Sequence, residues 1–102
     1  MKINPPIDMG GYDIASLSIS KYGNGAMAVQ AYTTDGEPAC TVSVNMPNDA
    51  KRLEDSEFFL KTWSENEAPV KALHNRGIIE IVTSKQPAYS GFVSAPVARL
   101  KV

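Results

Sequence analysis

Between residues 14 and 46 the chain alternates apolar and polar residues in three runs, and two turn sequences separate these runs. Alternation at period two places every second side chain on the same face of a β-sheet. Each turn sequence contains a pair, Asn24-Gly25 or Asp35-Gly36, that adopts the positive φ angles of hairpin turns. The pattern therefore predicts a three-stranded antiparallel meander. The apolar face is expected to consist of Leu17, Ile19, Met27, Val29, Ala31, Cys40, Val42, Val44 and Met46.

The opposite face of the expected meander is uncharged and carries hydroxyl and amide side chains. Charge is the usual deterrent to unwanted association of sheets, so this face is weakly protected. Three interpretations remain open, because solvent, the helix expected below or a partner are each able to cover it. The positions concerned are Ser16, Ser18, Ser20, Gln30, Thr41, Ser43 and Asn45.

The segments on either side of the meander are less regular. Residues 1–13 contain Pro5-Pro6 and Gly10-Gly11 and predict an irregular lead-in, because proline fixes φ and paired glycines cost entropy inside an element. Pro47 ends the meander, since it has no amide hydrogen for a ladder. Residues 57–63 combine three aromatic side chains with alternation, which favours a strand over a helix.

A short helix is expected before residue 77. One interpretation starts it with a capping box of Ser64 and Glu67, and another uses Asn66 as the cap, which places Pro69 in the first turn, where proline is tolerated. Gly77 matches a left-handed stop at the C-terminal end. A helix of about 10 residues depends on tertiary packing for its stability.

The last part of the chain returns to extended structure. Residues 78–82 are β-branched and predict a strand, and residues 83–91 are expected to form a loop. Pro96 interrupts the last extended segment, residues 92–102, and indicates an edge strand or a crossover. The predicted fold class is therefore α+β: an antiparallel sheet of the meander plus one to three further strands, with one or two short helices. Residues 1–102 are expected to form a single domain.

Composition narrows the class of protein. The 102 residues carry a formal net charge of −1, which argues against attraction of the whole surface to nucleic acid or to an anionic membrane. Cys40 is the only cysteine, so an intramolecular disulfide and a zinc site of several thiolates are both excluded. No stretch approaches the ~20 apolar residues of a membrane span, and the N-terminus lacks the apolar region of a secretion signal. We therefore expect a cytoplasmic protein.

Charge is unevenly distributed along the sequence. Residues 54–67 hold five acidic and one basic side chain, whereas residues 68–102 hold one acidic and five basic ones. One interpretation is that the two groups pair on a solvated surface. The other is an acidic surface that competes with phosphate for a basic groove of a partner protein. The candidate partner contacts are Glu54, Asp55, Glu57, Glu65 and Glu67.

Candidate catalytic groups are few. His74 is the only histidine and lies near the C-terminal end of the expected helix, where its side chain interacts favourably with the helix dipole. No serine-hydrolase signature is present in the sequence. Cys40 falls on the apolar face of its strand, which indicates an inert thiol, although the sequence leaves a dyad with His74 open. Glycine patterns that bind phosphates are absent, so we expect no catalytic, cofactor or metal site. Two carboxylate pairs resemble fragments of metal sites without calcium-loop spacing: Glu65/Glu67 and Asp35/Glu37.

Several segments of the chain form a recognisable set: Tyr22-Gly23-Asn24-Gly25, Ala28-Val29-Gln30, Asp35-Gly36-Glu37-Pro38, Thr41-Val42-Ser43-Val44-Asn45, Lys61-Thr62-Trp63-Ser64-Glu65-Asn66-Glu67 and Ser90-Gly91-Phe92-Val93. Together they resemble a family of small proteins of unassigned function that phages and conjugative elements of gut bacteria carry. The resemblance covers most of residues 15–100. One branch of that family is linked to inhibition of type II-A CRISPR nucleases.

The resemblance implies a stoichiometric anti-CRISPR inhibitor of a mobile genetic element, with the guide-loaded nuclease as its protein partner and no active site of its own. Such an inhibitor acts by occluding a basic groove or by trapping a conformational step. The main alternative is a nucleic-acid accessory protein of a phage or conjugative element. That alternative relies on the basic residues of the C-terminal third: Arg76, Lys85, Arg99 and Lys101.

Overall fold

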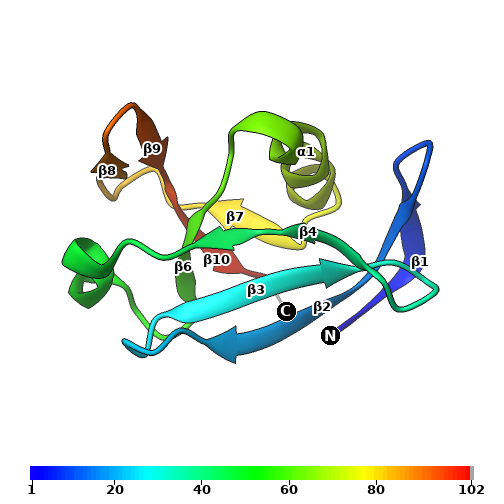
Figure 1. The fold of residues 1–102 in the computed structure, drawn as a ribbon, viewed down its shortest axis with the longest axis horizontal. Helices are drawn as coiled ribbons and strands as arrows, with labels where there is room; N and C mark the ends of the chain where they lie inside the picture. The colour runs from blue at the N-terminus through cyan, green and yellow to red at the C-terminus, as the bar shows by residue number, and fades with distance from the viewer. Residues whose placement is uncertain (102) are drawn as a thin grey trace.

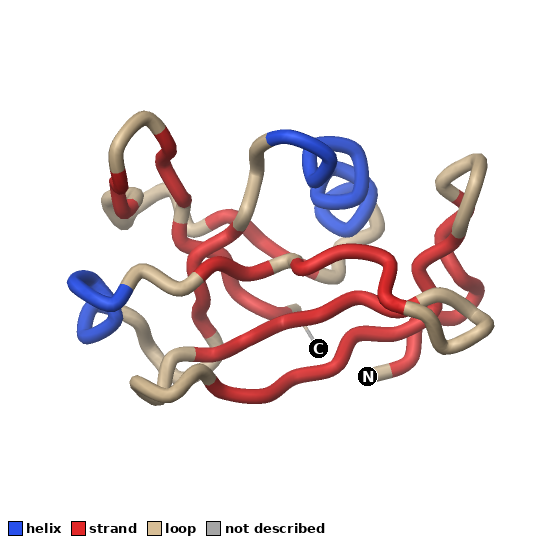
Figure 2. The backbone as a smooth tube through the Cα atoms, in the orientation of Figure 1, coloured by secondary structure: helices blue, strands red, loops and turns tan. Residues whose placement is uncertain are grey.

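The computed structural model describes residues 1–101 and contains two four-stranded antiparallel sheets, a two-stranded hairpin and one α-helix (Figures 1 and 2). The first sheet has the order β1-β2-β3-β4, the second has the order β5-β6-β10-β7, and β8 pairs only with β9. The α+β class with an N-terminal meander is confirmed. The elements are β1 (Lys2–Asp8), β2 (Asp13–Lys21), β3 (Met27–Tyr32), β4 (Pro38–Thr41), β5 (Ser43–Val44), η1 (Pro47–Arg52), β6 (Glu57–Leu60), η2 (Ser64–Asn66), α1 (Glu67–Asn75), β7 (Ile79–Ile81), β8 (Ala88–Ser90), β9 (Val93–Ala95) and β10 (Val97–Leu100).

Both predicted turns of the meander form, and they share one design. In the β2–β3 turn the amide of Tyr22 bonds to the carbonyl of Ala26 at 2.8 Å, and Gly25 adopts a φ of 87°. In the β3–β4 turn Thr33 bonds to Glu37 at 2.8 Å, and Gly36 adopts a φ of 84°. Each turn is thus a three-residue loop whose last residue is left-handed, the geometry for which glycine is favoured.

Val42 is the corner at which the chain passes from the first sheet to the second. Its amide donates to the carbonyl of Val29 at 2.9 Å, and its own carbonyl accepts from the amide of Lys61 at 2.9 Å. The corner breaks the expected alternation, because Val42 and Ser43 are both buried. Ser43 was predicted on the outward face, and this placement is wrong: its hydroxyl accepts the amide hydrogen of Val29 and bonds to the hydroxyl of Tyr22, each at 2.8 Å.

The main core lies between the two sheets and α1. It draws Leu17 from β2, Phe58 from β6 and Leu73 from α1, among other side chains. The opposite face of the second sheet has its own apolar cluster, in which Phe59 packs with residues of the β8–β9 hairpin. Apolar contacts on both faces bury Phe58, Phe59 and Leu60 of β6, and the strand predicted within residues 57–63 is confirmed for residues 57–60.

The N-terminal segment differs from its prediction. Residues 1–13 were expected to be irregular, but Lys2–Asp8 forms β1 and pairs with β2. Ile3 and Ile7 are buried in the main core. Their burial stabilises the extended conformation of this segment despite the two prolines. The prolines fall in the gap of the ladder between Lys2 and Ile7, where the register shifts.

The helix ends as predicted, and it begins after Asn66, as one of the two interpretations expected. At its C-terminal end the amide of Ile78 donates to the carbonyl of Leu73, and the amide of Gly77 donates to the carbonyl of His74. Gly77 has a φ of 77°. Asn66 is the N-cap residue, and Pro69 lies in the first turn, but no side chain makes a capping hydrogen bond there. The Asn66 side chain instead donates to the carbonyls of Thr41 and Lys61, which ties the helix start to the sheet corner. No helix within residues 1–101 has the length and apolarity to cross a membrane.

The C-terminal segment also differs from its prediction in one respect. Residues 79–81 form the expected strand β7, but β10 is a central strand between β6 and β7 and not an edge. Pro96 stands immediately before β10, at the junction with the β8–β9 hairpin, so it removes no donor from the central ladder. Residues 88–90, expected in a loop, form β8.

Candidate interaction surface

The five predicted contact residues do not form one surface. Glu54 and Asp55 are exposed before β6, and Glu65 and Glu67 are exposed after it, so the strand separates the acidic run into two groups. Glu57 is only 1% exposed. Its proposed role as a partner contact is therefore wrong, since its carboxylate is turned into the protein.

Glu57 is a buried carboxylate that forms ion pairs with two partly exposed cations. One carboxylate oxygen accepts from the ammonium of Lys85 at 2.6 Å and from the amide of Glu54 at 2.9 Å, while the guanidinium of Arg99 lies 3.5 Å from the other oxygen. Burial acts to raise the pKa of Glu57, but the hydrogen bonds from Lys85 and Glu54 outweigh it, and the pKa is lowered. The pKa of Lys85 is raised by its bonds to Glu57 and Glu54. Lys85 thus holds the loop before β8 against the loop before β6.

Glu65 keeps its charge under all ordinary conditions. Hydrogen bonds from the hydroxyl of Ser64, from its own backbone amide and from Lys61 lower its pKa to about 2. The ammonium of Lys61 lies 3.3 Å from the Glu65 carboxylate, whose side chain is 69% exposed. The acidic group after β6 is therefore partly neutralised by its own neighbour.

The basic residues of the C-terminal third are also distributed in local pairs. Arg99 and Lys101 lie 3.4 and 3.7 Å from the carboxylate of Glu80, and Arg76 donates to the carbonyl of Pro5 at 2.8 Å. The ion pairs that support pairing between the acidic and basic parts of the sequence are those of Lys85 with Glu54 and Glu57 and of Arg99 with Glu57.

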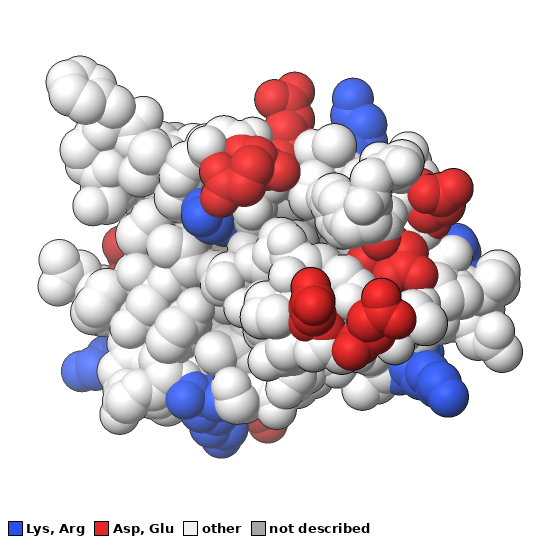
Figure 3. Space-filling model, turned by 45° about the vertical axis from the view of Figure 1, so that its right-hand side comes forward, with Lys and Arg blue, Asp and Glu red and all other residues white. Residues whose placement is uncertain are grey.

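A third acidic group lies at one end of the first sheet, between the β1–β2 and β3–β4 turns. Figure 3 brings this end toward the viewer, and acidic side chains gather on it. Asp13 is held there by the amide of Thr34 at 2.8 Å and by the Thr34 hydroxyl, and these bonds lower its pKa, the hydroxyl most strongly. No set of side chains within residues 1–101 has the geometry of a metal site. The sequence pointed to one pair only, and the fold assembles Asp8, Asp13, Asp35 and Glu37 around one shallow hollow.

The two candidate catalytic side chains lie on separate elements. Cys40 belongs to β4 and is half-buried, whereas His74 is exposed in the last turn of α1. Burial raises the pKa of the Cys40 thiol, the charge of Glu65 adds to this and Lys61 opposes it. A raised pKa leaves little thiolate at neutral pH.

The β8–β9 hairpin carries the most exposed aromatic side chains of the described residues. Phe92 has a relative exposure of 109% and Tyr89 of 67%. The hairpin lies at the upper left of Figure 1, beyond the second sheet and away from the first. Residues 86–96 contain no charged side chain. The lack of charge in this run was the only signal in the sequence, because we expected a loop over residues 83–91.

The base of this hairpin is anchored, in contrast to its tip. Ala88 and Ala95 are 1% and 0% exposed and pack with Phe59 in the second apolar cluster. Trp63 and Val93 are partly buried against the same cluster. The hairpin therefore presents its aromatic tip from a fixed base, and we call Tyr89 and Phe92 the aromatic tip.

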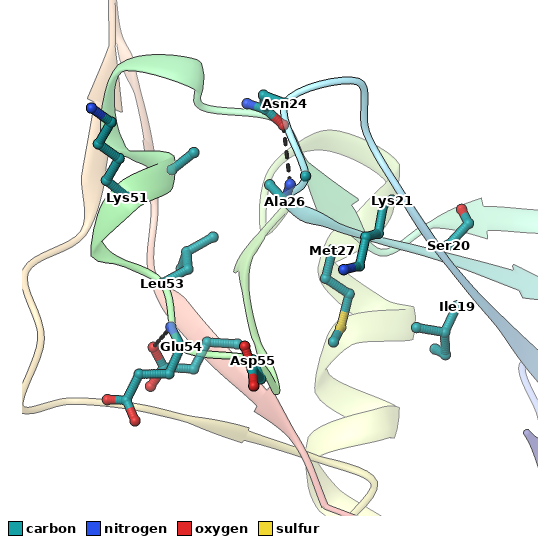
Figure 4. A pocket seen from close by; sticks show the side chains of 13 residues that line it. Ile19, Ser20, Lys21, Asn24, Ala26, Met27, Lys51, Leu53, Glu54 and Asp55 are labelled. Atoms are coloured by element: carbon teal, nitrogen blue, oxygen red, sulfur yellow. Dashed lines mark hydrogen bonds between the residues drawn. The ribbon is translucent and has the colours of Figure 1, made fainter.

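Another hollow, of about 250 Å³, lies between the β2–β3 turn and the loop that leads from η1 to β6 (Figure 4). Ile19, Met27 and Leu53 give it an apolar floor, and Lys21 and Asp55 are among its charged lining. Ile19 was predicted on the buried face of the meander, yet it is 42% exposed. The half of β2 that is next to the β2–β3 turn therefore lies outside the core.

Searches of protein-family models, of curated proteins and of solved structures found no match to this chain.

Proposed function

We propose that this chain is a non-enzymatic interaction protein that docks on a protein partner through the aromatic tip of the β8–β9 hairpin. The exposure of Phe92, complete at 109%, carries this proposal. An isolated chain gains nothing from holding a phenylalanine in water at the end of an anchored hairpin, whereas burial of such a ring in a partner's pocket is a major source of binding energy.

The lack of charge around the tip supports a protein pocket as its target. Residues 86–96 offer only hydroxyl, amide and apolar groups besides the ring, so no charged group must be desolvated on docking. Aromatic residues are enriched and charged residues are depleted in the cores of protein interfaces. A fixed base also reduces the entropy lost when the tip is bound.

The sequence resemblance supplies the partner to test first. We propose that the chain is an anti-CRISPR inhibitor from a mobile genetic element, acting in the bacterial cytoplasm on a guide-loaded type II-A nuclease. In this role the tip enters an apolar pocket of the nuclease, and the exposed carboxylates Glu54, Asp55, Glu65 and Glu67 face its basic grooves.

The test measures binding of the purified chain to the guide-loaded nuclease by biolayer interferometry and DNA cleavage at near-stoichiometric ratios. We expect tight association and loss of cleavage. Phe92→Ala is expected to weaken binding about 30-fold or more, as a central interface anchor does. Tyr12→Ala is the matched control, because Tyr12 is an exposed aromatic (40%) in the β1–β2 turn.

Each result has a distinct meaning. Failure of the wild-type chain to bind or inhibit rejects the nuclease as partner. Tight binding that Phe92→Ala and Tyr89→Ala leave unchanged rejects the tip as the contact, and loss of binding in Asp55→Asn or Glu65→Gln would then return the contact to the acidic residues. Catalytic turnover of a small molecule by the folded chain would overturn the non-enzymatic assignment.

A further inference from the structure

The β8–β9 hairpin is an excursion between two strands that are neighbours in the second sheet. β7 and β10 pair with each other, and the amide of Val82 donates to the carbonyl of Val97 at 2.8 Å, so the chain leaves and rejoins this sheet at one place. β8 pairs only with β9. One further backbone bond joins the excursion to β6, from the amide of Leu60 to the carbonyl of Pro96 at 2.9 Å. Strand pairing therefore fixes the ends of residues 83–96 but not the direction of the hairpin between them.

The apolar contacts at the base hold the hairpin without setting its direction. Ala88 and Ala95 pack in the cluster that contains Phe59, and each of them presents a single methyl group. Hydrophobic burial is non-directional. Hydrogen bonds weaken steeply when they are bent, so polar contacts are better suited to set a direction.

Lys85 supplies such contacts immediately before the hairpin. Its ammonium donates to Glu57 Oε1 at 2.6 Å, to Glu54 Oε2 at 3.0 Å and to the carbonyl of Arg52 at 3.3 Å. An ammonium has three protons, and these acceptors use all of them. In return, the guanidinium of Arg52 donates to the carbonyl of Gln86 at 2.8 Å. The loop before β6 and the loop before β8 thus hold each other through hydrogen bonds in both directions.

The groups on either side of Lys85 are restrained. Glu57 is 1% exposed, and the guanidinium of Arg99 lies 3.5 Å from its second carboxylate oxygen. Only Gln86 and Pro87 separate Lys85 from β8. A proline fixes its own φ angle and restricts the residue before it, so this connection is stiff. The position of Lys85 is therefore transmitted to β8.

We propose that Lys85 is a positioning residue for the aromatic tip: its ammonium fixes the direction in which the hairpin leaves the second sheet, and the affinity for the partner depends on that direction. The inference rests on the proposed function, since it concerns the same tip. A hairpin that turns freely is able to dock for only a fraction of the time, and the apparent dissociation constant rises by the inverse of that fraction. A fraction of about one tenth makes binding about ten-fold weaker.

The first test uses the isolated chain and needs no partner. Lys85→Met removes the ammonium and keeps an apolar stem, and NMR relaxation measures the order parameters of the Tyr89 and Phe92 amides. We expect these to fall from about 0.85, the value of a rigid backbone, to below about 0.6. The amide of Gly25 in the β2–β3 turn is the internal control and keeps its order, because it bonds to the carbonyl of Tyr22.

Two further variants separate direction from stability. Lys85→Met alone leaves the buried Glu57 carboxylate without its closest cation, which is destabilising, so Lys85→Met/Glu57→Gln removes both charges together. Lys101→Met is the matched control: it deletes an ammonium that lies 3.7 Å from Glu80, at the other end of the β7–β10 pair. We expect the double variant to lose the order of the tip and Lys101→Met to retain it. Urea denaturation confirms that each variant is folded.

The second test measures binding to the guide-loaded nuclease by biolayer interferometry. Lys85→Met/Glu57→Gln is expected to raise the dissociation constant about ten-fold. If Lys85 acts through the tip, the same two substitutions have little further effect in a chain that already carries Phe92→Ala, because residues that act through one another are not additive. A lysine that contacts the partner directly would instead lose the same factor in both backgrounds.

Three results would overturn the inference. They are a tip that keeps its order in Lys85→Met/Glu57→Gln, a disordered tip with unchanged affinity, and equal losses of affinity with and without Phe92. Failure of the wild-type chain to bind the nuclease rejects that partner, whereas the order parameters of the isolated chain still decide whether Lys85 fixes the tip. The proposed function and this inference therefore fail or succeed separately.

Discussion

The β2–β3 hairpin pairs six residues on each strand, whereas the β8–β9 hairpin pairs only three. The turn of the first is held by polar bonds, including one of 3.0 Å between the side chains of Asn24 and Asn45, and its strands supply Leu17 and Val29 to the main core. The tip of the second holds a fully exposed phenylalanine. The residues of the first hairpin contribute to the stability of the fold, whereas Phe92 at the tip of the second contributes little to it. An exposed side chain with no role in folding is the better indication of a binding site.

The substitution with the largest expected effect creates a cavity beside the first hairpin. Leu17 is 1% exposed in the main core. Leu17→Ala is expected to lower the free energy of unfolding by about 3 kcal/mol, because it loses transfer energy and leaves a cavity. Urea denaturation measures the effect. A loss below about 1 kcal/mol would show that this hairpin is not the structural one.

The corner beside this hairpin gives the next largest effect. Ser43→Ala removes the acceptor of the Val29 amide and leaves that buried donor without a partner. The expected loss of stability is about 2 kcal/mol, the cost of an unsatisfied buried group. Thr41→Ala, at an exposed position of the same segment, is the control and should cost much less.

The ion pair at the base of the second sheet adds a dependence on pH. The folded-state pKa of Glu57 is lowered, so its stabilisation is complete above the ordinary glutamate value of about 4.3 and is lost as pH falls through the folded pKa. Glu57→Gln is expected to cost about 1.5 kcal/mol at pH 7 and to flatten stability below pH ~5. Equal acid sensitivity of variant and wild type would contradict this.

The smallest expected effect belongs to the aromatic tip. Phe92→Ala should change the free energy of unfolding by less than about 0.5 kcal/mol, since an exposed side chain loses little when it is truncated. The thermal midpoint of the isolated chain measures it. A clear destabilisation would mean that Phe92 packs within the monomer, and the contrast between the two hairpins would disappear.

Local rules carried much of the fold. The turns at Gly25 and Gly36, the stop at Gly77 and the strands at residues 57–60 and 79–81 follow from turn chemistry and periodicity. The failures arise where distant contacts decide. Burial of isoleucines overrides the prolines of β1, and the corner at Val42 turns Ser43 inward.

The candidate surface was harder to predict for the same reason. A linear acidic run does not reveal that β6 separates its two parts, or that Lys85 and Arg99 enclose Glu57. The exposed tip depends on how the hairpin leaves the second sheet. Only the uncharged composition of residues 86–96 was visible in advance.

The central position of β10 has a consequence for how the molecule is made. During synthesis the ribosome delivers residues 97–100 after every strand that they join, so β6 and β7 wait without the neighbour that lies between them. The first sheet has all of its strands by residue 41, long before this moment. A nascent chain would thus fold in two stages, and a chaperone would encounter it while β6 and β7 of the second sheet are still unpaired with β10.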